Sequence, residues 1–342
     1  MFYLEKAGRL VIPRTELTYP CHKMDLHQKA AKAPVDHVMA DFEDACPYEF
    51  KGEQSRKTMV EALNTVDFGD RVVVIRPNNI KSKYFLGDID AIMTGAVDRF
   101  HGIILPKTNE PDDIVHLSRL LDAYEKKAGW ETHVMIEALI ETPIAVVNAF
   151  PIATASERMA GLIFGIADFA SAMGVPEMVA DQNRNFHYAK QAVCVAAKAA
   201  GLHAIDNAWL QLWRKDTPAD EVEAIQAGLK DKCEGSAALG MDGTWVIHPQ
   251  QAEISNAAFG PSDEEIEEAK HAVTYYHEQG GGSIYDPKYG KFHDEATIKG
   301  VLMMLAKGVQ AGQISNEFLQ EVAKKSEEVS GYNILEMMRR VV

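Results

Sequence analysis

The sequence has 342 residues, of which 46% are hydrophobic and 25% are charged, and 35 Lys and Arg residues against 50 Asp and Glu residues give a formal net charge of -15. This composition predicts a globular protein with a large core rather than a disordered chain. The negative charge disfavours a protein whose main role is to coat nucleic acid or an anionic membrane, because both would repel it. It still allows a local basic pocket for one anionic small molecule.

The four cysteines lie far apart in the sequence, at Cys21, Cys46, Cys194 and Cys233. They form no Cys-x-x-Cys pair, so the sequence predicts neither a disulfide framework nor a zinc knuckle, and a reducing compartment is the default. No apolar run reaches the roughly 18 residues of a membrane span, and the first residues lack the basic-then-apolar pattern of a signal peptide. We therefore expect a cytoplasmic protein with no nucleic-acid or membrane partner.

Short apolar runs that end in polar residues recur over roughly 250 residues, each separated from the next by enough chain for one helix. This alternation is typical of parallel strands joined by crossover helices. It predicts an α/β protein with a closed (β/α)8 TIM barrel. The alternative is a doubly wound open sheet, but no early strand is followed by a Gly-x-Gly-x-x-Gly turn. The eight runs are residues 9–13 (RLVIP), 36–41 (DHVMAD), 71–76 (RVVVIR), 101–106 (HGIILP), 133–138 (HVMIEA), 161–166 (GLIFGI), 201–205 (GLHAI) and 243–248 (GTWVIH).

Helix signals stand between these runs. Pro111 opens a periodic apolar stretch that closes at Gly129, and a second stretch runs from Asn185 to Ala200 and stops at Gly201. Proline at the start and glycine just past the end are the usual helix boundaries.

The texture of the sequence changes from about Ala258. Ser262 with the acids after it predicts a helix start, and a loop with three glycines at 280–282 follows that helix. Three consecutive glycines favour a hinge over a helix. We predict two domains, a barrel over residues 1–258 and a helical lid over residues 259–342.

Four carboxylates follow predicted strands, and in a barrel the carboxyl ends of all strands meet on the rim that holds the active site. They are Glu43, Asp44, Glu141 and Asp168. Like charges at short range cannot all stay ionised without a cation, and ligands that are all oxygen suit a hard ion such as Mg²⁺. We expect Glu141 and Asp168 to bind the metal directly, and Glu43 and Asp44 to hold its water ligands. The alternative is that these acids cap the following helices.

Three basic side chains also follow strands. Arg76 closes an apolar run, and its planar set of donors suits a carboxylate or a developing enolate oxygen, although a structural salt bridge to Glu43 or Asp44 is the alternative. Lys107 allows the same two interpretations, and we favour the structural one. A single histidine such as His248 is more often a structural hydrogen-bonding residue than a base.

The ordered set of these segments resembles the HpcH/HpaI aldolase and citrate lyase beta subunit family, and within it the malyl-CoA lyase-like and citramalyl-CoA lyase-like enzymes. The resemblance runs from about Arg9 to the C-terminal helices. No single segment carries it. The matching segments are residues 41–47 (DFEDACP) with Lys51 and Arg56 downstream, 74–78 (VIRPN), 102–107 (GIILPK), 136–143 (IEALIETP), 161–169 (GLIFGIADF) and 246–251 (VIHPQQ).

The resemblance implies a Mg²⁺-dependent carbon–carbon lyase, with Mn²⁺ as a possible substitute, that cleaves malyl-CoA or citramalyl-CoA to acetyl-CoA and glyoxylate or pyruvate and also runs the reverse condensation. By position it makes Glu141 and Asp168 the metal ligands and Arg76 the residue that stabilises the enolate. Residues 286–297 resemble a lid motif whose general acid/base is Asp294, often delivered to a neighbouring subunit of a homotrimer or homohexamer. The alternative role for Asp294 is a helix N-cap.

Two departures from the family pattern concern the start of the barrel and the arginine. Residues 13–20 stand where a Pro-Gly phosphate-binding turn is usual, which leaves Arg14 and Lys23 as candidates for the phosphates of coenzyme A. Pro77 follows Arg76 where a small apolar residue is more usual.

Other activities fit almost as well. They are a malyl-CoA thioesterase, a malate synthase-like enzyme, and a citrate lyase beta-like subunit that needs an acyl-carrier partner. The 2-oxoacid also stays open between glyoxylate, pyruvate and oxaloacetate, because an apolar pocket separates two substrates that differ by one methyl group by only about 1–3 kcal/mol.

Overall fold

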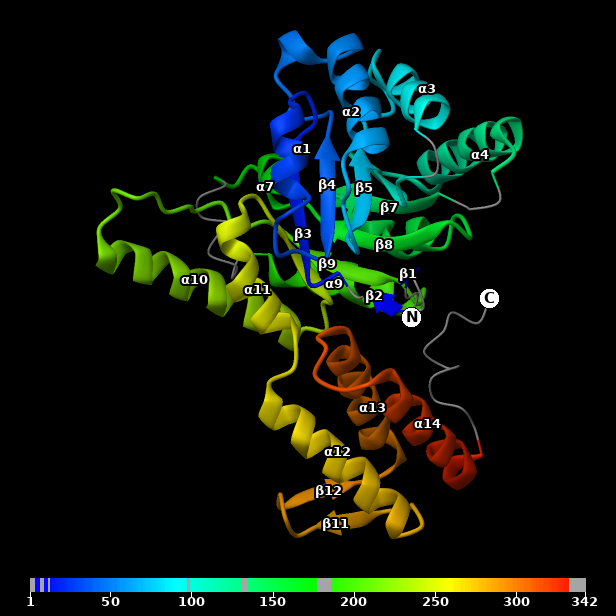
Figure 1. Ribbon diagram of the computed structural model, residues 1–342, viewed down its shortest axis with the longest axis vertical. Coiled ribbons are helices and arrows are strands. Elements are labelled where there is room, and N and C mark those ends of the chain that lie inside the picture. The colour runs from blue at the N-terminus through cyan, green and yellow to red at the C-terminus, as the bar shows by residue number, and fades with distance from the viewer. Residues whose placement is uncertain are drawn as a thin grey trace. The chain divides into compact units, whose positions relative to one another are not determined.

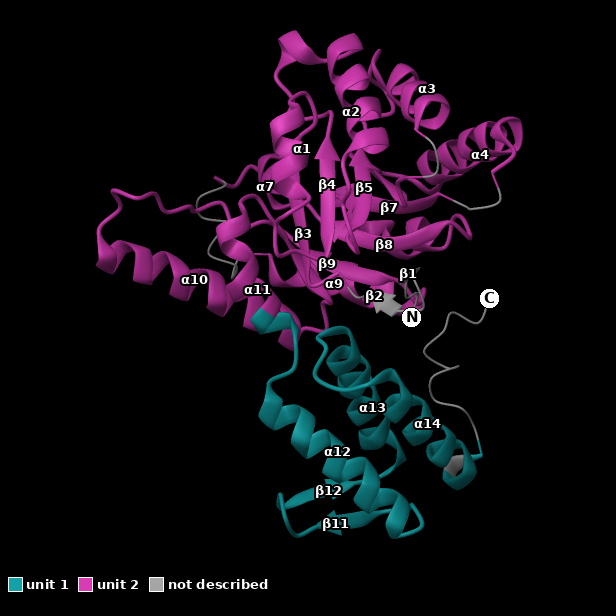
Figure 2. Cartoon of the chain, in the orientation of Figure 1, with its two compact units in different colours: residues 1–12, 257–342 teal, residues 13–256 magenta. Residues whose placement is uncertain are grey.

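A computed structural model describes residues 4–6, 9–11, 13–96, 99–130, 134–176 and 186–331 of the chain. The chain divides into two compact units, one of Pro13–Asn256 and one of Met1–Ile12 with Ala257–Val342 (Figure 2). The first twelve residues, which the sequence prediction assigned to the barrel, belong to the same unit as the C-terminal segment. The two units are described separately below.

The unit of residues 13–256 is a closed barrel of parallel strands in the order β10-β3-β4-β5-β6-β7-β8-β9, with β10 pairing to β3 to close the ring (Figure 1). This architecture confirms the predicted TIM-barrel class. The strands are β3 Thr15–Pro20, β4 His37–Asp41, β5 Val72–Arg76, β6 Gly102–Leu105, β7 Met135–Ile140, β8 Met159–Phe164, β9 His203–Asp206 and β10 Gly243–Val246.

The first barrel strand differs from the prediction. Residues 9–13 were expected to form it, but Arg9–Val11 is β2, which pairs antiparallel with β1 Leu4–Lys6 outside the barrel, and Ile12 lies outside the described residues. The barrel begins instead with β3, whose residues Thr15 and Glu16 are fully buried. Buried strand positions are usually apolar. Because this strand has polar residues at buried positions, its sequence was interpreted as a turn.

The other predicted strands lie within a few residues of observed ones, although His133 falls outside the described residues. Every residue of β4, β5, β6, β8, β9 and β10 is buried. Strands that are covered on both faces have near-continuous apolar sequences, which is why their positions could be predicted.

Helices connect these strands on the outside of the barrel (Figure 1). The predicted helix over 111–129 is α4, which starts at Pro111 after a capping box between Glu110 and Asp113 and stops at Gly129 in the left-handed conformation, φ 67°. The second predicted helix is α9, which ends at Ala199, while Asn185 lies outside the described residues. The helical elements are α1 Met24–Ala30, η1 Tyr48–Phe50, α2 Glu53–Thr65, α3 Phe85–Gly95, α4 Pro111–Ala128, α5 Pro143–Val147, α6 Ala149–Ala153, α7 Ile166–Ala172, α9 His187–Ala199, α10 Ala219–Ala238, η2 Pro249–Gln251 and α11 Ala252–Phe259.

The second unit contains α12 Asp263–Glu278, β11 Ile284–Asp286, β12 Lys291–His293, α13 Glu295–Gln310 and α14 Asn316–Ser330. Ser262 caps α12 through a capping box with Glu265, as its sequence predicts. Within the stretch that was expected to be a loop, residues 284–286 and 291–293 pair as an antiparallel hairpin.

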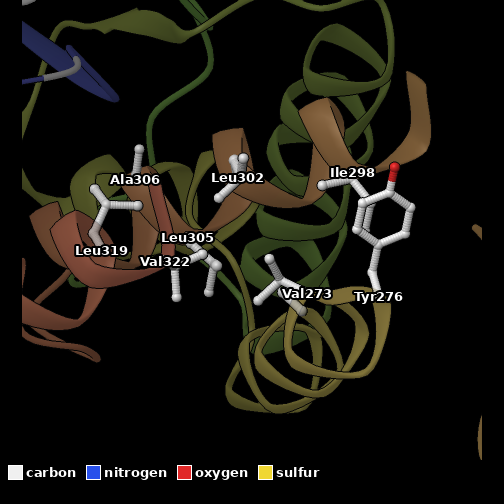
Figure 3. Packing of buried hydrophobic residues seen from close by; sticks show 9 residues of the cluster. Val273, Tyr276, Ile298, Leu302, Leu305, Ala306, Leu319 and Val322 are labelled. Carbon is white, nitrogen blue, oxygen red and sulfur yellow. The ribbon is translucent and has the colours of Figure 1, made fainter. Parts of the chain in front are cut away.

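The core of this unit lies between its three helices (Figure 3). Val273 of α12, Leu302 and Leu305 of α13 and Leu319 of α14 have no exposed surface. Gly308 allows α13 to approach α12 closely, because a Cβ atom there would lie 2.4 Å from Cδ1 of Ile266. Among the described helices, none is long and apolar enough to cross a membrane.

Candidate active site

The strand-end residues of the barrel gather on one rim, as the fold predicts. Asp41 and Arg76 are the last residues of β4 and β5, Lys107 and Glu141 follow β6 and β7, and Asp168 lies in the first turn of α7 after β8. These five residues come from consecutive strands of the ring.

A buried ion pair joins Arg76 to Asp41. Nε and Nη2 of Arg76 donate to the two carboxylate oxygens at 2.8 and 2.6 Å. Burial alone would raise the pKa of Asp41, but the charge of Arg76 keeps this pKa below its usual value. The guanidinium also stacks over the ring of Trp245 at 5.3 Å. The predicted bridge from Arg76 to Glu43 is present as a longer contact of 3.5 Å from Nη1 to Oε2.

Glu43 lies between two cations. Its Oε1 accepts a hydrogen bond from Nζ of Lys107 at 3.0 Å, whereas Oε2 receives no hydrogen bond in the described part of the chain. Burial is the main cause that raises the pKa of Glu43 to about 7. Oε2 is buried and faces Nη1 of Arg76, so the carboxylate of Glu43 is held between Arg76 and Lys107.

Lys107 connects the acids of the rim. Its Nζ is 3.0 Å from Glu43, 3.7 Å from Asp44 and 3.5 Å from Asp168. Burial would lower the pKa of Lys107, but these three carboxylates raise it. Lys107 also has a positive φ of 52°, in a region that residues other than glycine rarely adopt and that tends to occur at functional sites.

Glu141 is almost fully buried, with 3% exposure. Its Oε1 accepts a hydrogen bond from the backbone N–H of Lys107 at 2.6 Å. Burial, followed by the charge of Glu43, raises the pKa of Glu141 well above its usual value. Gly165 makes room for this side chain, because a Cβ atom there would lie 2.7 Å from Cβ and 3.0 Å from Oε2 of Glu141.

The residues present fit a magnesium ion. Glu141, which is nearly buried, and Asp168, which is partly exposed, offer only carboxylate oxygens, and Mg²⁺ usually takes one or two protein carboxylates together with waters and substrate oxygens. Burial first, and then the charge of a neighbouring carboxylate on the rim, raises the pKa values of Glu43 and Glu141, although Arg76 lowers both. A divalent cation would let these groups ionise together.

Two residues that the sequence suggested for coenzyme A lie at opposite ends of the barrel. Lys23 is exposed and follows β3 at the carboxyl end, next to the rim. Arg14 precedes β3 at the other end, where its side chain forms a two-point ion pair with Asp36. Arg14 is therefore withdrawn from the candidate CoA site, because its donors are engaged and it lies on the wrong side of the barrel.

Asp294 caps α13 in the C-terminal unit. Its Oδ1 accepts a hydrogen bond from the backbone N–H of Thr297 at 2.9 Å, and this bond lowers the pKa of the carboxyl. The side chain of Asp294 is half-buried at this helix start. Asp294 therefore has the N-cap role that the sequence analysis gave as the alternative to a general acid/base.

Three features of the rim were not singled out from the sequence. They are the pairing of Asp41, the stacking of Trp245 and the central position of Lys107. Asp41 stands in the same acidic segment as Glu43, and its place as the last residue of a buried strand was the available signal. His248 accepts a hydrogen bond from the backbone N–H of Gln250 at 3.3 Å, which agrees with its favoured structural role.

The chain is similar in sequence and in fold to known proteins. Residues 14–249 match the HpcH/HpaI aldolase/citrate lyase family. The L-malyl-CoA/beta-methylmalyl-CoA lyase of Cereibacter sphaeroides is 29% identical over 305 residues, which cover 84% of this chain and 91% of the relative. The citrate lyase subunit beta of Leuconostoc mesenteroides subsp. cremoris is 30% identical over 277 residues, which cover 79% and 85%. A crystal structure of protein CitE from Mycobacterium tuberculosis with magnesium, acetoacetate and coenzyme A has a TM-score of 0.67 at 23% identity and covers 86% of this chain and 97% of that one.

Proposed function

The chain belongs to the HpcH/HpaI aldolase/citrate lyase family, and we propose that it is a Mg²⁺-dependent carbon–carbon lyase that cleaves a 3-hydroxyacyl-CoA thioester to acetyl-CoA and a 2-oxoacid. The observation that carries the proposal is the rim on which Glu43, Glu141 and Asp168 surround Lys107 beside the buried Arg76. Curated relatives with this activity align over most of the chain, and they include lyases of malyl-CoA. The proposed substrates are malyl-CoA and citramalyl-CoA.

Glu141 and Asp168 would hold the magnesium ion, and Glu43 and Asp44 would orient its waters. When bound, Mg²⁺ supplies a Lewis acid for the carboxylate and carbonyl oxygens of the 2-oxoacid. Gly165 and the backbone N–H of Lys107 fix the position of Glu141, so the ligand is ordered before the metal arrives.

Arg76 would stabilise the thioester enolate that forms when the carbon–carbon bond breaks. Its Nε and Nη2 are engaged by Asp41, which leaves Nη1 directed toward Glu43 and the rim. Burial would disfavour the charged guanidinium, but the two-point pairing with Asp41 keeps it charged and fixed. Fixed donors that face a developing negative charge favour the transition state without reorganisation.

Asp294 would move the proton at the methyl carbon of acetyl-CoA when the C-terminal unit closes over a barrel. We propose that it acts on the site of a neighbouring subunit in a homotrimer or homohexamer. Its side chain is only half-buried where it caps α13, so it is partly open to a partner surface. Lys23 on the same rim as the carboxylates is the proposed contact for a phosphate of coenzyme A.

An assay of the purified protein with malyl-CoA and with both citramalyl-CoA stereoisomers tests the function. With Mg²⁺ we expect acetyl-CoA together with glyoxylate or pyruvate, no turnover in excess chelator, and recovery on adding Mg²⁺ back. Free coenzyme A with intact malate would show a thioesterase instead. Activity that appears only with an acyl-carrier protein would show a citrate lyase beta-like subunit.

A further inference from the structure

A second cluster of ligand-type residues lies inside the barrel, below the rim. It consists of Glu16 on β3, His37 on β4 and Glu137 on β7. His37 and Glu137 each precede a rim residue by four positions: Asp41 is on the same strand as His37, and Glu141 directly follows the strand of Glu137. At about 3.3 Å per residue, the backbone positions of each pair are roughly 13 Å apart along the strand direction.

The three side chains converge on one point. Each offers one ligand atom, and these atoms lie within 4.8 Å of one another; no other trio of His, Cys, Asp or Glu residues in the described part of the chain meets this condition. Glu16 and His37 have no exposed surface, and Glu137 is 2% exposed. The cluster is therefore closed to bulk water.

One oxygen of each buried carboxyl has no donor from a third residue in the described structure, and the two carboxyl groups are close enough to interact with each other. Oε2 of Glu16 accepts a hydrogen bond from Nε1 of Trp245 at 2.8 Å, but its Oε1 and the Oε2 of Glu137 receive none. Burial and the charge of Glu137 raise the pKa of Glu16 well above its usual value, and burial raises the pKa of Glu137 to about 7. Two buried carboxylates at this separation need either a cation or a shared proton.

The neighbouring strand β8 lies against Glu137. Gly161 of β8 is paired in register with Glu137, and a Cβ atom on it would lie 3.4 Å from Oε1 of Glu137 and 3.5 Å from Cβ of His203. These distances are ordinary van der Waals contacts, so the side chain of Glu137 packs against Gly161 on this side.

We propose that Glu16, His37 and Glu137 bind a divalent transition-metal ion of the Zn²⁺ type inside the barrel, at a site separate from the rim. One imidazole nitrogen and two carboxylate oxygens form a ligand set that suits zinc, whereas the oxygen-only rim suits magnesium. Nε1 of Trp245 donates a hydrogen bond to the second oxygen of Glu16 and so orients this carboxylate, as the hydrogen-bond partners of metal ligands commonly do.

The position of the site gives the ion a structural role. In the closed strand order, β3 and β7 stand on opposite sides of the ring, so an ion held by Glu16 and Glu137 bridges the two walls of the barrel. Because the site is enclosed, the ion enters as the chain folds, and binding stabilises the folded state.

The test measures bound zinc in a variant whose rim has lost its two proposed metal ligands. The full-length Glu141→Gln/Asp168→Asn variant is produced in zinc-supplemented medium, dialysed against Mg²⁺ and a weak chelator, and analysed by elemental mass spectrometry. We expect about one zinc ion per chain, and less than about a tenth of that when Glu137→Gln is added. Zinc should also raise the unfolding temperature of the first variant but not of the second.

A spectroscopic measurement covers the case in which Glu137→Gln prevents folding. X-ray absorption of zinc in the Glu141→Gln/Asp168→Asn variant should show a single imidazole ligand with oxygen ligands and no sulfur. A folded variant that holds no zinc, both after expression and after refolding with Zn²⁺, would overturn the proposal and assign a shared proton to the two carboxyls. A zinc shell without imidazole would also overturn it.

Discussion

Arg76 and Asp41 close the ends of neighbouring strands with a two-point ion pair, in which Nε and Nη2 donate to the two carboxylate oxygens at 2.8 and 2.6 Å. The two residues are also directly paired in the register of β4 and β5. A buried arginine with both of these donors engaged cannot rotate, so its remaining Nη1 is held in one place. Asp41 therefore fixes the orientation of the Arg76 guanidinium on the rim.

Replacing Asp41 should destabilise the protein and reduce its activity. Asp41→Asn leaves the buried Arg76 charge without its partner, and breaking such a pair by removing one member typically costs about 3–5 kcal/mol. Urea unfolding measures the loss of stability, and Asp44→Asn is the matched control because that side chain is 56% exposed and should change stability little. Equal stability of the two variants would contradict the structural importance of the pair.

Lys107 occupies the place where the carboxylates of the rim need positive charge, so its removal should favour a divalent cation. We expect Lys107→Met to tighten Mg²⁺ binding by about tenfold, equal to about 1.4 kcal/mol, because Glu43, Asp44 and Asp168 lose their ammonium partner. Isothermal titration calorimetry of the protein with MgCl₂ measures the change. Weaker binding in this variant would show that Lys107 organises the ligands rather than competing with the metal.

Lys107→Gly separates charge from backbone strain at the same position. Lys107→Met and Lys107→Gly both remove the charge, but only glycine adopts the observed φ of 52° without strain. We therefore expect the two variants to bind Mg²⁺ alike and the glycine variant to be more stable by about 1 kcal/mol in urea unfolding. A methionine variant as stable as the glycine variant would show that the loop relaxes to another conformation.

Most of the barrel could be predicted from the sequence because its strands are buried on both faces and read as apolar runs. The first strand could not be predicted, because Thr15 and Glu16 are polar residues that are buried in the protein. The apolar segment just before them, residues 9–13, was predicted to be the strand instead. The burial of Glu16 depends on partners more than a hundred residues away, Glu137 and Trp245, which no local pattern contains.

The candidate site was predictable to the extent that it depends on strand ends. Glu43, Glu141 and Asp168 could be placed on one rim because each follows a strand of the barrel. The pairing of Arg76 with Asp41 rather than Asp44 follows from the register between two strands, and the central place of Lys107 follows from a left-handed backbone. Neither the register nor that conformation can be read from residue types.

Asp294 should prove to have two separable roles. Asp294→Asn keeps a side-chain oxygen that can cap α13 but removes the acid, whereas Asp294→Ala removes both and should lower stability by about 1 kcal/mol. We expect the asparagine variant to lose most of its turnover at nearly unchanged stability. Thermal unfolding and steady-state kinetics of the two variants measure this separation.

Mixing inactive variants tests whether Asp294 acts on a neighbouring subunit. If it does, Asp294→Asn and Asp168→Asn subunits that are mixed under exchange conditions should regain activity, because some sites then combine an intact lid with an intact rim. A mixture that stays inactive while native gels show mixed oligomers would place Asp294 in the site of its own chain.

His203 should make the stability of the barrel fall as the pH falls from about 6.5 to about 4. Its side chain is fully buried, neither ring nitrogen has a hydrogen-bond partner among the described residues, and burial lowers its pKa to about 4. Between that value and the ordinary pKa of about 6.5, the unfolded chain binds a proton that the folded chain does not, so acid favours unfolding. A shift of this size corresponds to about 3 kcal/mol at most.

The comparison of wild type with His203→Leu isolates this contribution, because Glu43 and Glu137 have raised pKa values and act in the opposite direction over a similar range. Their effect is common to both proteins and cancels in the difference. Urea unfolding at intervals between pH 4 and 7 should show a wild-type stability that declines toward acid relative to the leucine variant. A difference that stays constant across this range would mean that His203 is protonated in the folded protein, with a charge partner inside the barrel.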